Sequence, residues 1–527
     1  MIYKQKKILQ MKNYKSIHLV ALGLVLSMAI SWTGCTKNFE KRNTSPTGLE
    51  TLTADDVKAF FPTAVYNGLS LAYQTGQNLA AGMFTQYYSC TQVAFASHRY
   101  VMNQQWWAST WNGLYVSVMS PLNNIINQTE DKPSMNAIAR IWKVFIFHRY
   151  TDYFGPLPYS QMGNYVEGEG VPFDAQKDIY DDFFKELDEA TTLLKDNLSV
   201  PSFGSTNDYI YHGDNAKWLK FANSLRLRLA LRISFVNPEK AKTEAMAALA
   251  GGVMESPDDD AFMEAGVTHR NYLAYISAWN EFRMSANFES LFKGYNDPRM
   301  RLYFSPTVAD GVFRGGRAGL VPGEQTVGYN RYDYLSDLGP HYRPDIAYTS
   351  PFSVMYAAES YFLRAEGALN QWDMGGTAEE LYNKGIEASM KSWGITNQTV
   401  INDYINGTSL PIAPAPESDW NTPPLTDIPV KFSSVGEKQR EQIGTQKWIA
   451  LYPGDMEAWA EMRRTGYPKM YPLIHSDNPN MPKDQMIRRI VFPDRAYQTD
   501  PKSTEAAVLM LGPGGDKVST KLWWDVK

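Results

Sequence analysis

The sequence has little of the chemistry on which most enzymes depend. Its 527 residues include two cysteines and seven histidines, and the histidines are scattered along the chain. It contains no HExxH, GxSxG or P-loop pattern and no Cys/His cluster with the spacing of metal ligands. The sequence therefore predicts no metal and no cofactor, and we expect a binding protein. A secreted glycan-cleaving enzyme stays open as an alternative, because a glycoside hydrolase needs only two positioned carboxylates.

The N-terminal residues lack acids and have the parts of an export signal. Five lysines precede an apolar run, "IHLVALGLVLSMAI", which is too short to span a bilayer comfortably. Small residues then lead to Cys35, and Thr33-Gly34-Cys35 resembles a bacterial lipobox. We predict a lipoprotein signal peptide over 1–34, with Met1 or Met11 as the start, and a lipidated Cys35 with a polar tether over 35–50. The alternatives are an ordinary signal peptidase site and a simple membrane anchor.

If Cys35 carries lipid, Cys90 has no partner and an intrachain disulfide is excluded, so the core must hold the exported protein together.

Positive charge is also scarce. The chain has 51 basic and 56 acidic side chains, and without the five lysines of residues 1–34 it has 46 and 56, a net charge of −10. An acidic chain disfavours nucleic acid as a partner.

Aromatic residues are abundant instead, at 13% of the chain, with 32 Tyr and 14 Trp. Their flat apolar faces and polar edges suit sugars and protein partners, although large helical cores use them too. Helical spacing of apolar residues dominates the rest of the sequence. It predicts helices over 53–76, 111–130, 136–155, 174–197, 215–237, 351–372 and 377–393.

The last two of these segments are predicted to pack as a pair. Thr377 and Glu380 have capping-box spacing, and the small residues Ala365 and Gly385 let two helices approach closely, near the positions of a tetratricopeptide repeat. Long Gly/Pro-rich segments over 305–350 and 403–435 are predicted loops. We therefore predict a single all-α (mainly α-helical) domain over 51–527, with a tetratricopeptide-like helix-pair scaffold and long irregular loops that carry the ligand surface.

An ordered set of motifs resembles the SusD/RagB family, in the SusD-like subgroup. The motifs are "IWKVFIFHRYTDYFGPLPYSQ", "YIYHGDNAKWLKFANSLRLRLALRIS", "NDPRM", "AESYFLRAEGA", "EQIGTQKWIALYPGDMEAWAEMRRTGYP", "RRIVFPDRAY" and the tail "KLWWDVK". The resemblance implies a helical, lipid-anchored protein on the cell surface of the outer membrane. Such proteins capture glycans, or in some members peptides, and pass them to a SusC-type TonB-dependent outer-membrane transporter. A third hypothesis is that the protein is a purely structural lid and that the transporter alone recognises the ligand.

Most residues in these motifs are expected to be structural. We expect packing or buried hydrogen bonds for Trp218, Asn223, Arg226, Arg228, Trp459, Arg463 and Arg464, and a chain turn at Gly155, Pro156 and Pro158. The run Asp258-Asp259-Asp260 offers oxygen ligands for calcium, but a solvated acidic turn is the preferred interpretation.

The first candidate ligand site is the stretch "SHRYVMNQQWWASTW", Ser97 to Trp111, predicted as a loop between two helices. Its candidate ligand-binding residues are Arg99, Tyr100, Asn103, Trp106 and Trp107. Aromatic rings stack on the C–H faces of sugars, while amide and guanidinium groups bond hydroxyls. Because neighbours on a strand point to opposite sides, at least one of the two tryptophans should be exposed. The alternative is that both pack beneath the loop.

The second candidate site is "HRNYLAYISAWNEFRMSANF", residues 269–288, which offers the same chemistry. Its candidate ligand-binding residues are Tyr272, Tyr275, Trp279 and Asn280, with Arg283 nearby.

Overall fold

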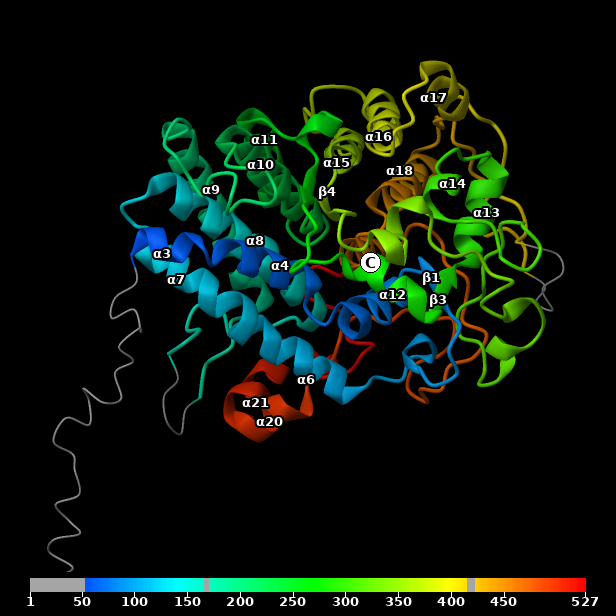
Figure 1. Ribbon diagram of the computed structural model, residues 1–527, viewed down its shortest axis with the longest axis horizontal. Helices are drawn as coiled ribbons and strands as arrows, with labels where there is room; N and C mark the ends of the chain where they lie inside the picture. Colours follow the sequence, from blue (N-terminus) through cyan, green and yellow to red (C-terminus); the bar gives the residue numbers. More distant parts are fainter. Residues whose placement is uncertain (1–52, 165–169, 415–421) are drawn as a thin grey trace, which may run out of the picture. The chain divides into compact units, whose positions relative to one another are not determined.

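The computed structural model describes residues 53–164, 170–414 and 422–527, and helices dominate it (Figure 1). The predicted signal peptide, Cys35 and the tether lie outside the described residues. Among the helices that are described, none has both the length and the apolar composition needed to cross a bilayer.

The long helices pack in successive pairs along the chain (Figure 1). In the described part, these pairs are α8 (Pro133–Phe154) with α9 (Gln176–Asp196), α10 (Asn215–Arg232) with α11 (Pro238–Gly251), α15 (Ala357–Leu369) with α16 (Ala378–Ser392), and α18 (Gly436–Leu451) with α19 (Asp455–Thr465). Neighbouring pairs touch through α9 and α10, α10 and α15, and α15 and α18. The predicted all-α fold with a helix-pair scaffold is confirmed.

Shorter elements surround this scaffold. The other α-helices are α3 (Ala54–Lys58), α4 (Phe61–Ser70), α5 (Ala81–Phe84), α6 (Gln104–Gly113), α7 (Ser120–Gln128), α12 (Tyr272–Ile276), α13 (Ala286–Tyr295), α14 (Met300–Tyr303), α17 (Gln398–Ile405), α20 (Asp494–Thr499) and α21 (Pro501–Met510). Two π-helices are η1 (Tyr73–Asn78) and η3 (Leu114–Met119). Single 3₁₀ turns are η2 (Ser97–Arg99), η4 (Pro257–Asp259), η5 (Ser277–Trp279), η6 (Glu324–Thr326), η7 (Gly328–Asn330), η8 (Pro340–Tyr342), η9 (Pro344–Ile346) and η10 (Gly512–Gly514).

Within the described residues, four short strands form two antiparallel pairs. Strand β1 (Tyr88–Cys90) pairs with β3 (Phe282–Met284), in the register Tyr88 opposite Met284. Strand β2 (Ala261–Met263) pairs with β4 (Phe352–Met355), with an irregularity between Ala261 and Phe262. The first pair joins segments nearly 200 positions apart in the sequence, and both candidate ligand stretches adjoin it.

Three sequence predictions of local structure are wrong in detail. The helix predicted over 53–76 is broken into α3, α4 and η1. The segment predicted as helix over 351–372 begins as strand β4, because residues 352–355 find pairing partners in β2, and becomes helical only at Ala357. The stretch 97–111, predicted as a loop, is η2 followed by the first eight residues of α6.

The α15–α16 pair has the features that its sequence predicted. The Thr377 hydroxyl accepts from the backbone N–H of Glu380, and the Glu380 carboxylate accepts from the N–H of Thr377, so the capping box is formed. A Cβ atom at Gly385 would lie 2.9 Å from the ring of Phe362 on α15. The absent side chain therefore sets how closely the two helices approach.

The residues expected to be structural are placed in the interior. Trp218 is fully buried, and its indole N–H donates to Asp208 at 2.7 Å. Gly155 ends α8 with a φ of 87°, a conformation that favours glycine. In the acidic run, Asp259 caps η4 and pairs with Lys220 at 2.7 Å, while Asp260 accepts from the N–H of Ala357 at 2.7 Å. These carboxylates serve as helix caps. The expectation of a solvated turn is wrong for Asp259 and Asp260, which are buried, while Asp258 is exposed.

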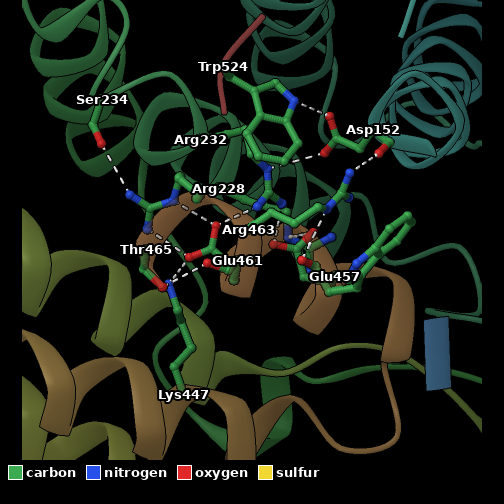
Figure 2. A network of polar contacts seen from close by, with 12 residues as sticks. Asp152, Arg228, Arg232, Ser234, Lys447, Glu457, Glu461, Arg463, Thr465 and Trp524 are labelled. Carbon is green, nitrogen blue, oxygen red and sulfur yellow. Dashed lines mark hydrogen bonds and ion pairs between the residues drawn. The ribbon is translucent and has the colours of Figure 1, made fainter. Parts of the chain in front are cut away.

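A buried network of ion pairs joins five of the scaffold helices (Figure 2). Its carboxylates are Asp152 on α8, Glu359 and Glu366 on α15, and Glu457 and Glu461 on α19. Its ion-paired cations are Arg228 and Arg232 on α10, Lys447 on α18 and Arg464 on α19, and a fifth cation, Arg463 on α19, donates to the backbone carbonyl of Asp152 at 2.7 Å. Five positive charges thus face five negative ones in the interior.

The contacts within this network are short and multiple. Arg232 reaches Glu457 and Glu461, both at 2.5 Å, and Asp152 at 3.2 Å. Arg464 bridges Glu366 at 2.6 Å and Glu461 at 2.7 Å. Because each charge has partners on other helices, the network fixes the relative positions of the helix pairs.

Candidate functional site

The first candidate stretch follows β1 and is fastened to the C-terminal part of the chain. Arg99 is 3% exposed, and its Nε donates to Asp477 Oδ2 at 2.6 Å. The Tyr100 hydroxyl donates to the carbonyl of Gln485 at 2.8 Å. Both side chains are therefore occupied within the protein. Tyr100, with Ser519, also lines two surface cavities of about 420 and 580 Å³.

The two adjacent tryptophans of this stretch lie on helix α6 and differ in burial. The Asn103 side chain begins the helix by accepting from the N–H groups of Gln105 and Trp106. Trp107 is fully buried, whereas Trp106 is half-buried and meets the half-buried ring of Phe95 edge-on, with 5.9 Å between ring centres. One of the two tryptophans is thus partly exposed, but helix geometry, not strand alternation, decides which.

The second candidate stretch forms an exposed row of aromatic rings. Helix α12 buries Leu273, Ala274 and Ile276, while Tyr272 and Tyr275 stay half-exposed. The rings of Tyr272 and Tyr275 have centres 6.3 Å apart, and those of Tyr275 and Trp279 are 5.5 Å apart. Trp279 is 40% exposed, which is unusual for so large an apolar side chain.

Two further residues extend the row. Tyr66 of α4 stacks on Tyr272 with 6.4 Å between ring centres and 27° between ring planes. The guanidinium of Arg270 lies 3.6 Å from the ring centre of Tyr275 and 5.1 Å from that of Tyr272. We call Tyr66, Tyr272, Tyr275, Trp279 and Arg270 the aromatic platform.

The electrostatics of the platform favour a fixed positive charge at its surface. A hydrogen bond with Tyr272 raises the pKa of Arg270 above its usual range, and one with the exposed Tyr348 adds to this effect. At the other end, Glu281 accepts from the side-chain amide of Gln74 at 2.6 Å, and burial raises the pKa of this carboxyl. The platform rings and the Arg270 guanidinium therefore have an amide, that of Gln74, and a carboxylate, that of Glu281, near them.

The β1–β3 pair brings the two candidate stretches to the same edge of the protein. Asn280 is held in a left-handed conformation with a φ of 56°, and its carbonyl accepts from Thr91 Oγ1 at 2.5 Å and from Gln92 Nε2 at 3.2 Å. Thr91 and Gln92 begin the segment that leads to Phe95 and its partner Trp106. Residues 91–96 thus connect the platform to the Phe95–Trp106 pair.

Sequence reasoning missed three members of this surface: Tyr66, Phe95 and Arg270. Tyr66 lies within a predicted helix, and nothing in the sequence indicates that its ring leaves the core. Arg270 lies within the predicted stretch, two positions before Tyr272, but was not named among its candidate residues. Of the predicted ligand-binding residues, Tyr272, Tyr275 and Trp279 belong to the platform and Asn280 lies next to it. Arg99, Tyr100 and Trp107 lie in the interior.

Comparisons with known proteins place the chain in a family. The family model for SusD-like proteins, described as SusD and RagB outer membrane lipoprotein, matches residues 50–525. No sequence among curated proteins matches.

Several solved structures are similar over almost their entire length. A chitin-binding SusD homologue from Flavobacterium johnsoniae is 33% identical, with a TM-score of 0.82, covering 89% of this chain and 99% of that one. A SusD-like protein from Bacteroides thetaiotaomicron is 34% identical, with a TM-score of 0.79 and coverages of 89% and 99%. A further structure, described as a chitin-binding protein, is 31% identical, with a TM-score of 0.73 and coverages of 89% and 99%. The chain therefore belongs to the SusD/RagB family of outer-membrane lipoproteins.

Proposed function

We propose that this protein captures glycan chains at the cell surface on its aromatic platform and delivers them to a SusC-type TonB-dependent outer-membrane transporter. The observation that carries the proposal is the exposed ring row Tyr272–Tyr275–Trp279, braced by Arg270. The C–H faces of sugar rings stack on aromatic faces, and the guanidinium and amide groups beside them can donate to hydroxyl or acetamido oxygens.

The relatives give the proposal a first ligand to test. Two of the solved family members described above are chitin-binding proteins, at 33% and 31% identity. Chitin is a polymer of N-acetylglucosamine, whose acetamido carbonyl is a good hydrogen-bond acceptor. Arg270 and Gln74 are the donors on the platform and its rim that would suit such a group, so chitin oligosaccharides are the probes we would use first.

The location and the partner rest on the family and on the N-terminal sequence. We propose that Cys35 is acylated and holds the protein at the outer membrane, because Cys35 follows a short apolar segment and family members are outer-membrane lipoproteins. The transporter partner is proposed from the family resemblance alone.

The test is a binding measurement on residues 36–527 without lipid. Insoluble chitin, other polysaccharide gels and a peptide pool would be compared by pull-down, and chitin oligosaccharides would be titrated by calorimetry. We expect Trp279→Ala to weaken glycan binding by about tenfold, since an exposed aromatic side chain at the centre of a binding surface contributes about 1.4 kcal/mol or more.

A matched control is Tyr361→Ala. Tyr361 is a half-exposed tyrosine on α15 whose ring also lies beside an arginine, with Arg364 5.3 Å from its centre. The Tyr361→Ala variant should leave glycan binding unchanged. Binding of peptides instead of glycans would favour the peptide-binding alternative. No binding of either class would favour the structural-lid reading.

A further inference from the structure

A second group of tyrosines, two of them exposed and one half-exposed, lies near the platform. Tyr329, Tyr332 and Tyr334 come from the long loop between α14 and β4, and we call them the tyrosine cluster. Tyr329 is 38% exposed and Tyr332 is 47% exposed. The rings of Tyr329 and Tyr334 meet edge-on with 5.4 Å between centres. Nothing in the fold requires large aromatic side chains at these exposed positions.

Arginines hold these rings in place. The Arg314 guanidinium lies 4.5 Å from the ring centre of Tyr329 and donates to the carbonyl of Tyr334 at 2.9 Å. The loop backbone is also tied down: the N–H of Met284 in β3 donates to Ser336, and the N–H of Ser336 donates to Arg314, both at 2.9 Å. The cluster is therefore an ordered surface, which lowers the entropy cost of binding a ligand.

One buried arginine connects the cluster to the platform. Arg283 of β3 is 4% exposed, and its side chain lies between the two groups. On one side it donates to the side-chain oxygen of Asn280, the residue directly after Trp279. On the other side it donates to the carbonyl of Tyr332 at 3.1 Å, with its guanidinium 5.6 Å from the Tyr332 ring centre.

We infer that the tyrosine cluster is a second ring-stacking site on the same binding surface, so that the protein selects extended glycan chains over short oligosaccharides. This inference rests on the proposed function and adds the length of the ligand to it. An extended polymer can contact the platform and the cluster at once, and the second contact is then made at high effective concentration. A ligand too short to extend from the platform to the cluster would contact only one of the two.

The ligand class is set by the chemistry of the cluster. Tyrosine rings with guanidinium groups behind them present apolar faces, and their hydroxyl edges donate and accept hydrogen bonds. Arg314 and Arg331 are paired with Asp310 at 2.9 Å and Asp333 at 2.6 Å. Their charges are thus largely balanced, which favours a neutral chain over an acidic one.

The experiment measures how binding affinity depends on ligand length in proteins with and without the tyrosine cluster. Chitin, cello- and malto-oligosaccharides, each from the dimer to the hexamer, would be titrated into the wild-type protein, the double variant Tyr329→Ala/Tyr332→Ala, and the control Tyr361→Ala. We expect the wild-type affinity to rise with length in the series that binds. The double variant should bind the shortest ligands as the wild type does and the hexamer about tenfold more weakly.

The outcomes separate the two proposals. If wild type and double variant show the same dependence on length, the inference is wrong while the proposed function stands. If no series binds the wild type at any length, both are wrong. Loss of a protein partner in outer-membrane pull-downs, with glycan affinity unchanged, would also overturn the inference. Tyr332→Phe keeps the ring and should retain hexamer binding; a tenfold loss there would contradict ring stacking as the cause.

Discussion

Glu461 lies at the centre of the buried ion network, and its replacement by glutamine should strongly destabilise the fold. The side chain contacts Arg232 at 2.5 Å, Arg464 at 2.7 Å and the Lys447 ammonium, and the residue is 4% exposed. Glu461→Gln leaves five buried cations facing four carboxylates. Removing one partner of a buried ion pair costs about 3–5 kcal/mol, because a charge is left uncompensated away from water.

Differential scanning calorimetry would measure this loss. Since the entropy of unfolding grows with chain length, a loss of 3–5 kcal/mol in a domain of this size lowers Tm by about 3–5 °C. The control is Asp345→Asn, which removes the partner of the exposed Arg343 at 3.3 Å and should leave Tm nearly unchanged. A Tm for Glu461→Gln no lower than that of the control would refute the reasoning.

A compensating change sharpens the test. Lys447 is 1% exposed and contacts Glu461 and Glu366, so Lys447→Met in the Glu461→Gln background restores charge balance with a similar volume. We expect the double variant to recover most of the lost stability, although the single Lys447→Met is itself destabilising. If the two losses simply added, charge imbalance would not be their cause.

The network also predicts acid sensitivity. Burial raises the pKa of Glu461, but the attraction of Arg464, Lys447 and Arg232 outweighs burial and holds the pKa well below its usual range. Because the folded-state pKa is lower than the unfolded one, this carboxylate contributes stability that is fully present above about pH 4 and is lost as the pH falls toward the folded-state pKa. The loss should be smaller in Glu461→Gln.

Three further predictions concern single sites. Burial raises the pKa of Asp455 to about 7, so this residue should lower the stability of the fold as the pH rises from about 4 to 7. Relative to the wild type, Asp455→Asn should therefore raise Tm more at pH 8 than at pH 5. Gly385→Ala should lower stability by about 1–3 kcal/mol in urea unfolding, because the new methyl group meets the Phe362 ring at 2.9 Å. Cys35→Ser should move the protein from the outer-membrane fraction to the soluble fraction, measured by immunoblot, with Cys90→Ser as the control.

The scaffold could be predicted from the sequence because its signals are local. The helices α8, α9 and α10 follow from apolar spacing over about twenty residues, and the start of α16 follows from two residues three positions apart. Strand β4 was mistaken for helix because its pairing partner, β2, lies about ninety positions earlier. No local pattern reports such a contact.

The candidate site was only partly predictable for the same reason. Arg99 has the composition of a ligand contact, yet it is bound to Asp477, 378 positions away. Trp106 and Trp107 are neighbours with the same chemistry, and only their orientation on α6 decides that one is buried. Tyr272, Tyr275 and Trp279 could be found because the composition of their stretch is rich in aromatic rings, while the sequence did not predict helix α12, on which Tyr272 and Tyr275 lie.

Strand β1 provides one connection between the scaffold and the platform, and it shows how the protein keeps an exposed aromatic surface in order. Tyr87, just before β1, donates its hydroxyl to the carbonyl of Trp448 on α18 at 2.7 Å, and the Trp448 indole donates to Thr85 at 3.1 Å. Strand β1 is thus fixed to the same helix that carries Lys447 of the ion network. Through β3 and Asn280, this attachment reaches Trp279, which is 40% exposed. Rigidity therefore comes from buried charges and pairing behind the platform, and the rings in front remain free to meet a ligand.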